Sequence, residues 1–110
     1  MQVTFESRDP EAHALRDVAE SRLRFAIRRL AWLVPRATVR LTDINGPRGG
    51  VDKRCQVELK TADGDVVVTS IARDWRVTLE AALVRAARAL SRSHQRRHAH
   101  RRHAGAVPAA

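Results

Sequence analysis

Four arginines recur at helical spacing near the C-terminal end of this 110-residue chain. They are Arg85, Arg88, Arg92 and Arg96, and we call them the arginine stripe. Residues three and four apart share one face of an α-helix, so these side chains would lie close together and repel one another. An anionic partner with regularly spaced charges, such as a nucleic-acid backbone, would relieve that repulsion. The spacing therefore favours nucleic-acid binding.

The net charge of +9 is concentrated in the same segment. Residues 1–80 hold 14 basic and 12 acidic residues, whereas residues 81–110 hold seven arginines and no acid. A solvated helix face is the plain alternative, and it usually applies where both signs of charge are mixed. Because no acid follows Glu80, we favour the nucleic-acid interpretation.

Two other regions carry basic residues that could join the contact. One is a predicted N-terminal helix, where Asp17 and Glu20 share the exposed side with the cations. The other is the stretch NGPRGGVDKRC at residues 45–55. The candidates from these regions are Arg24 and Arg28, with Arg22 and Arg29 beside them, and Arg48, Lys53 and Arg54.

The same glycine-rich stretch resembles a phosphate-binding loop only in composition. Such loops run from a strand into a helix, whose N-terminus supplies amides to the phosphate. Here the flanking segments both alternate like strands, and neither nucleotide-loop motif is present. The stretch is better interpreted as the basic tip of a hairpin.

Two aromatic residues of the N-terminal helix lie off the centre of its apolar stripe. Phe25 and Trp32 are seven residues apart. Either could stack on a nucleic-acid base, and either could pack at a seam between helices. The sequence leaves both alternatives open.

The residues that could support catalysis or metal binding are better explained by structure. Cys55 takes an inward position of a predicted strand, which favours a buried thiol. The aspartates at 43, 52, 63 and 65 flank predicted turns. His94 and His98 could chelate a metal from one helical turn, but neighbouring arginines would oppose a cation. We expect no enzyme activity, cofactor, metal or small-molecule substrate.

The hydrophobic pattern predicts the order β-α-β-β-β-α. Strand-like alternation covers residues 1–7, 37–44, 54–61 and 66–71, and helical periodicity covers Pro10 to about Val34 and the segment from Trp75 to about His94. A four-stranded sheet with both helices on one face would bury every apolar stripe. The predicted fold class is therefore an α+β sandwich of two layers.

One domain at residues 1–97 accounts for these elements, and residues 98–110 resemble a basic, disordered tail. No apolar run reaches the length of a signal peptide or a membrane span, so we expect a cytoplasmic protein without a membrane partner.

Residues 1–95 resemble the short form of the ribosome hibernation promoting factor family, also known as ribosome-associated inhibitor A. The resemblance lies in the opening strand and helix, MQVTFESRDPEAHALRDVAESRL, in the long hairpin, and most specifically in GDVVVTSIARDWRVTLEAALVRAARALSR. It implies the same β-α-β-β-β-α fold. Members bind the small ribosomal subunit in the channel for mRNA and tRNA, contact ribosomal RNA through basic helix residues, and hold idle bacterial ribosomes inactive under stress.

The family's basic positions match Arg85, Arg88 and Arg92 best, then Arg24 and Arg28, with Arg48, Lys53 and Arg54 a weaker assignment. Arg76 stands where many members have Tyr, and we include it among the rRNA-binding candidates. Val84 occupies a place that is often acidic, which makes this helix more positive than usual. The resemblance does not include the second domain of the long forms, so a second factor would be needed to pair two ribosomes.

Two other functions compete with this interpretation. A general RNA-binding or RNA-chaperone module would bind free structured RNA as well as ribosomes. A regulatory adaptor would use the basic segment on an acidic protein or a membrane surface.

Overall fold

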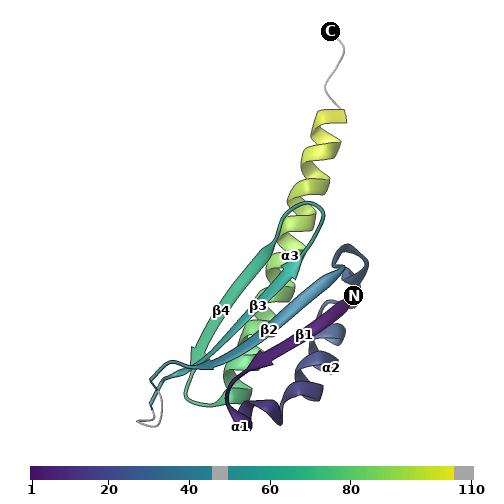
Figure 1. The fold of residues 1–110 in the computed structure, drawn as a ribbon. Helices are drawn as coiled ribbons and strands as arrows, with labels where there is room; N and C mark the ends of the chain where they lie inside the picture. The colour runs from purple at the N-terminus through teal and green to yellow at the C-terminus, as the bar shows by residue number, and fades with distance from the viewer. Residues whose placement is uncertain (46–49, 106–110) are drawn as a thin grey trace.

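The computed structural model describes the backbone of residues 1–45 and 50–105 and the side chains of residues 1–45 and 50–97. The elements are β1 (Gln2–Ser7), α1 (Pro10–His13), α2 (Arg16–Ala26), a 3-10 turn η1 (Ala31–Leu33), β2 (Arg36–Asp43), β3 (Lys53–Lys60), β4 (Val66–Ala72) and α3 (Trp75–Gly105). The four strands form one sheet in the order β1-β2-β3-β4 (Figure 1). The predicted α+β class and the order of elements are confirmed.

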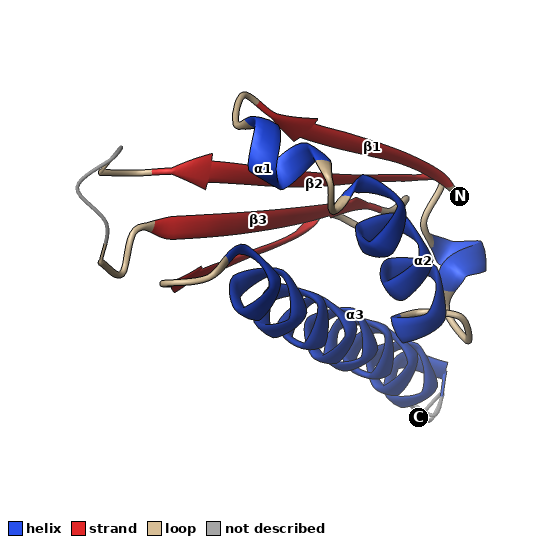
Figure 2. Cartoon of the chain, turned by 90° about the horizontal axis from the view of Figure 1, so that it is seen from below, coloured by secondary structure: helices blue, strands red, loops and turns tan. Residues whose placement is uncertain are grey.

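The sheet combines one parallel pair with two antiparallel hairpins. β1 runs parallel to β2, and β2, β3 and β4 are successively antiparallel. A parallel connection needs a crossover, and the helical segment between β1 and β2 supplies it. α2 and α3 lie on the same face of the sheet (Figure 2), as the apolar stripes predicted.

The core lies between this sheet face and the two helices. Alternate residues of β2 and β3 point into it, among them Val39 and Val57, and their neighbours point to the open face. From the helices, Leu23 and Leu79 are completely buried. Alanines on α3, Ala82 and Ala86, are also completely buried and allow the helix to lie close to the sheet.

The prediction of one continuous helix from Pro10 to Val34 was wrong. The segment divides into α1, α2 and η1, with turns between them. The chain leaves helical geometry at Ile27 so that both Ile27 and Val34 are buried, and the Pro35 carbonyl accepts a 2.9 Å hydrogen bond from the Gln2 amide at the start of the sheet. Tertiary packing outweighs periodicity here, and the segment contains no glycine or internal proline that would have marked the breaks.

α3 is longer than predicted. Its backbone stays helical through Gly105 and extends past the sheet (Figure 1). Residues 98–104 contain no glycine or proline, so no residue ends the helix there. Residues 106–110 of the predicted tail lie outside the described residues, and the domain boundary at residue 97 stays a prediction.

The start of α3 is set by Asp74. Its Oδ1 accepts hydrogen bonds from the amides of Arg76 (2.8 Å) and Val77 (3.2 Å), two groups that otherwise lack a partner in the first turn. Asp74→Ala should lower the free energy of unfolding by about 1 kcal/mol, measured by urea denaturation. Asp74→Asn keeps a capping oxygen and should lose much less; an equal loss in both variants would show that the cap is not the cause.

Candidate nucleic-acid interface

The arginine stripe lies on the exposed surface of α3. Arg85 reaches the edge of the sheet, where its Nη1 donates a 2.7 Å hydrogen bond to the carbonyl oxygen of Thr69 in β4. Arg88, Arg92 and Arg96 are exposed, and none forms an ion pair or hydrogen bond with another residue whose side chain the structure describes. The stripe therefore begins beside β4 at Arg85 and continues along the exposed face of α3 as a row of cations that no described acid neutralises.

Arg76 is exposed but does not join this row. It is nine residues before Arg85, which places it about 180° away around the helix. It also lies in the first turn of α3, where its amide donates to Asp74.

The arginines of α2 are partly used within the protein. Arg24 pairs with Glu20 at 3.0 Å, and Arg22 pairs with Glu80 of α3 at 3.1 Å. Arg28 places its guanidinium carbon 4.2 Å from the centre of the Phe25 ring and donates a 2.9 Å hydrogen bond to the Phe25 carbonyl. Arg28 and Arg29 thus remain the cations of this region without an ion pair among the described residues.

The two described hairpin candidates lie away from the stripe. The Lys53 ammonium is 2.8 Å from Asp43 and 3.5 Å from Asp52, and it lies 5.2 Å from the centre of the Trp75 ring. The hydrogen bond that Lys53 donates to Asp43 is the main cause that raises the pKa of Lys53. Arg54 is half-buried on the sheet face opposite the helices, and Arg48 lies outside the described residues.

A groove between α2 and α3 was not predicted from the sequence. We call it the α2–α3 groove; it encloses about 610 Å³ and is lined by Ser21, Arg22, Phe25, Ala26, Glu80, Leu83 and Val84. Phe25 is 66% exposed and Trp32 is 73% exposed. Most of the surface of both side chains is therefore exposed. Packing at a helix seam, one of the two alternatives for these residues, covers only the smaller part of each ring.

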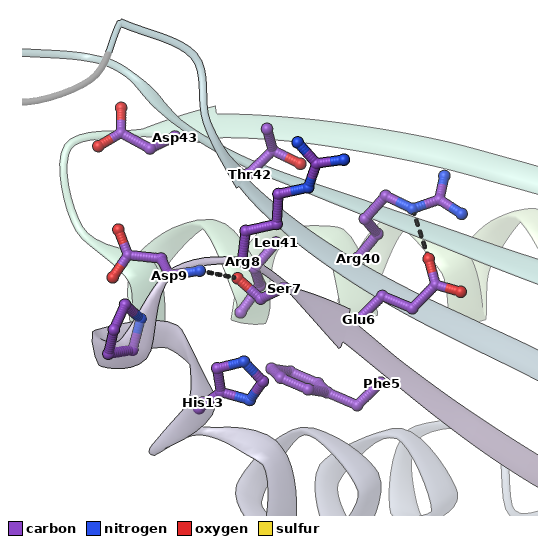
Figure 3. Close-up of a pocket in the computed structure, with 11 residues that line it drawn as sticks. Phe5, Glu6, Ser7, Arg8, Asp9, His13, Arg40, Leu41, Thr42 and Asp43 are labelled. Carbon is purple, nitrogen blue, oxygen red and sulfur yellow. Dashed lines mark hydrogen bonds and ion pairs between the residues drawn. The ribbon is translucent and has the colours of Figure 1, made fainter.

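A larger hollow of about 840 Å³ opens where β1 and β2 end (Figure 3). Three of its charged groups serve local structure: Arg40 pairs with Glu6 at 2.8 Å, and the Asp9 carboxylate accepts from the Glu11 amide at 2.9 Å. The His13 ring stands edge-on to Phe5. The hollow lies between the ends of β1 and β2 and the start of α1.

The groups considered for catalysis have structural partners. Burial raises the pKa of the Cys55 thiol to about 12, so the thiol is protonated at neutral pH. Asp43 and Asp52 flank Lys53, and Asp65 pairs with Lys60 at 3.2 Å. Within the described part of the chain no three His, Cys, Asp or Glu side chains gather as a metal site would require. No described helix is long and apolar enough to cross a membrane.

Comparison with solved structures finds close matches in shape. A ribosomal subunit interface protein from Coxiella burnetii matches with a TM-score of 0.66 and 18% identity, over 86% of this chain and 96% of that protein. The N-terminal domain of Protein Y from Thermus thermophilus matches with a TM-score of 0.62 and 20% identity, over 84% of this chain and 98% of that domain. The chain has their fold.

Both neighbours belong to the hibernation promoting factor family, so the resemblance seen in the sequence is confirmed at the level of the fold. The sequence itself matches no model of a protein family and no curated protein.

The burial of Cys55 predicts a loss of stability in alkali. The thiol ionises near its ordinary pKa of 9.0 in the unfolded chain but only near 12 in the folded one, so rising pH favours unfolding across that window. Between pH 8 and pH 10 the free energy of unfolding should fall by about 1 kcal/mol in urea titrations. Cys55→Val should not show this fall; an equal fall in the variant would contradict the assignment.

The hydrogen bond of Arg85 predicts a role in stability that the rest of the stripe lacks. Arg85→Ala should lower the free energy of unfolding by about 0.5–1 kcal/mol, since one exposed hydrogen bond is lost. Arg88→Ala, three residues along the same exposed face, should change it by less than about 0.5 kcal/mol. Thermal denaturation of the two variants, recorded together, checks the difference.

Proposed function

We propose that this protein is a cytoplasmic ribosome-binding factor that occupies the small subunit in the channel for mRNA and tRNA and holds the ribosome inactive. One observation carries the proposal: a row of exposed arginines without described acidic partners lies on a fold shared with a ribosomal subunit interface protein. The proposed partner surface is ribosomal RNA, and the proposed mode of action is occlusion rather than catalysis.

Arg88, Arg92 and Arg96 make the main phosphate contacts in this proposal. They are spaced over two turns of α3, and their guanidinium groups are available without breaking an interaction within the described protein. Arg85 adds a positive charge to the same surface and keeps its hydrogen bond to Thr69 in β4. Arg28 extends the contact from α2, and Arg24 would have to share its guanidinium with Glu20.

The other candidates differ in availability. Arg76 and Arg54 point away from the stripe, so they would touch RNA only if the partner surrounds the domain. Lys53 would have to leave Asp43, and we assign it a structural role. This division follows from charge compensation, since a cation already paired within the protein gains less from a phosphate.

Electrostatic contacts of this kind make affinity depend strongly on salt. Neutralisation of about five phosphates predicts a slope of roughly −4 in a plot of log affinity against log salt. Replacing Arg88, Arg92 and Arg96 together by Ala should weaken binding to vacant small subunits by roughly tenfold or more at moderate salt and make the slope shallower by about 3. Sucrose-gradient sedimentation and filter binding measure the two quantities.

The matched control replaces Arg16, Arg36 and Arg73 by Ala. These three arginines are exposed and lack a described ion pair, so the control has the same net charge as the first variant. A specific α3 contact predicts near-normal binding by the control. Equal loss in both variants would mean attraction by net charge alone and would contradict the proposal.

A general RNA-binding module remains the second candidate, favoured by the extension of helical α3 beyond the sheet. It predicts similar affinity for free hairpin RNA and for small subunits. Recognition of a defined channel instead predicts a strong preference for the subunit at one protein per particle.

A further inference from the structure

The α2–α3 groove contains an aromatic ring that is mostly exposed to solvent. Phe25 is 66% exposed, although burying such a ring would be favourable. Arg28 stacks its guanidinium over the ring and is held there by its hydrogen bond to the Phe25 carbonyl. The pair therefore forms a flat platform that is organised before any partner arrives.

The rest of the groove lining combines three apolar residues with Ser21 and the Arg22–Glu80 ion pair. Ala26 comes from α2, and Leu83 and Val84 come from α3. Beyond Ala26 a second hollow of about 270 Å³ continues between the helices as far as Leu90 and Gln95. From Glu80 to Gln95 the two hollows follow α3 for roughly 22 Å, at 1.5 Å per residue.

The surroundings of the two hollows are positively charged. Glu80, the acid in the lining of the groove, pairs with Arg22 at 3.1 Å. Arg28 and Arg29, which line the second hollow, remain exposed without a described ion pair. The groove thus offers a ring face, apolar walls and a cationic rim, which together complement a molecule with a flat aromatic part and a negative backbone.

We propose that the α2–α3 groove binds an unpaired RNA base, stacked on Phe25, with adjacent phosphates at Arg28 and Arg29. Stacking of this kind tolerates different bases, since each presents a π-face. The inference rests on the proposed function for one point, which is that the bound RNA is ribosomal RNA. It adds a contact to bases, whereas the arginine stripe contacts only the backbone.

The test compares two probes that have the same backbone charge. One is a fluorescein-labelled single-stranded RNA heptamer, and the other is an abasic heptamer of the same length. Fluorescence polarisation at low salt should show binding of the base-containing probe about tenfold tighter than that of the abasic probe. Equal affinity for the two probes, or no binding of either, would overturn the inference.

Substitutions at position 25 separate stacking from apolar contact. Phe25→Trp should keep the preference for bases, whereas Phe25→Ala and Phe25→Leu should reduce it by about tenfold. Retention of the preference by Phe25→Leu would indicate a non-stacking apolar contact, such as a protein side chain would make, and would overturn the proposal. Because Phe25 is mostly exposed, each variant should keep the fold, and circular dichroism checks this.

Two valine substitutions provide a second, independent readout. Val84→Glu introduces a carboxylate into the wall of the groove and should weaken binding of the base-containing probe. Val77→Glu introduces the same charge at an exposed position of α3 outside the groove lining and should have a smaller effect. Equal effects of the two substitutions would count against the groove as the site.

The oligonucleotide assay contains no ribosome, so it can fail separately from the proposed function. If wild type prefers bases through Phe25 but does not sediment with small subunits, the groove inference stands and the ribosomal proposal fails. If wild type sediments with small subunits while Phe25→Ala changes neither assay, the groove inference alone is overturned.

Discussion

The packing of α3 against β3 and β4 is the constraint on which the rest of the structure depends. Leu79 and Leu90 point into the core, and Ala82 and Ala86 let the helix approach the sheet. This burial sets the rotation of α3 about its axis. Because the arginine stripe is about 145° from the buried leucines, the same rotation places it on the surface beside β4. The position of the charge is thus a consequence of core packing.

The basic residues divide into two groups by what they contact. Arg22, Arg24 and Lys53 each have an acidic partner within 3.1 Å. Arg88, Arg92 and Arg96 have none among the described residues. Both groups contribute equally to the net charge. The unpaired arginines, however, would gain more binding free energy from an anionic partner than the paired residues would. These three arginines lie along one helix, whereas Arg16, Arg36 and Arg73, which also lack a described ion pair, are scattered over separate segments of the chain.

Much of the fold could be predicted from the sequence because its signals are local. Strand alternation and the apolar stripe of α3 identified the elements and their inward faces, and the helical periodicity placed the start of the last helix at Trp75. The breaks in the N-terminal helical segment could not be predicted, since the burial of Ile27 and Val34 depends on where β2 begins. The arginine stripe could be predicted from the sequence spacing of its residues alone. The Arg85 hydrogen bond to Thr69, the involvement of Lys53 with Asp43, and the α2–α3 groove all join distant segments, so they required the structure.

The bond between Arg85 and Thr69 has a consequence for how copies of this protein behave together. β4 ends the sheet and is rich in β-branched residues, with Val67 and Ile71 exposed. Such an edge can template pairing with the edge of another molecule. Arg85 occupies one of its carbonyl groups, and the cations that follow along α3 would meet like charges on an approaching copy. The positive row would therefore also oppose edge-to-edge pairing between two copies of β4.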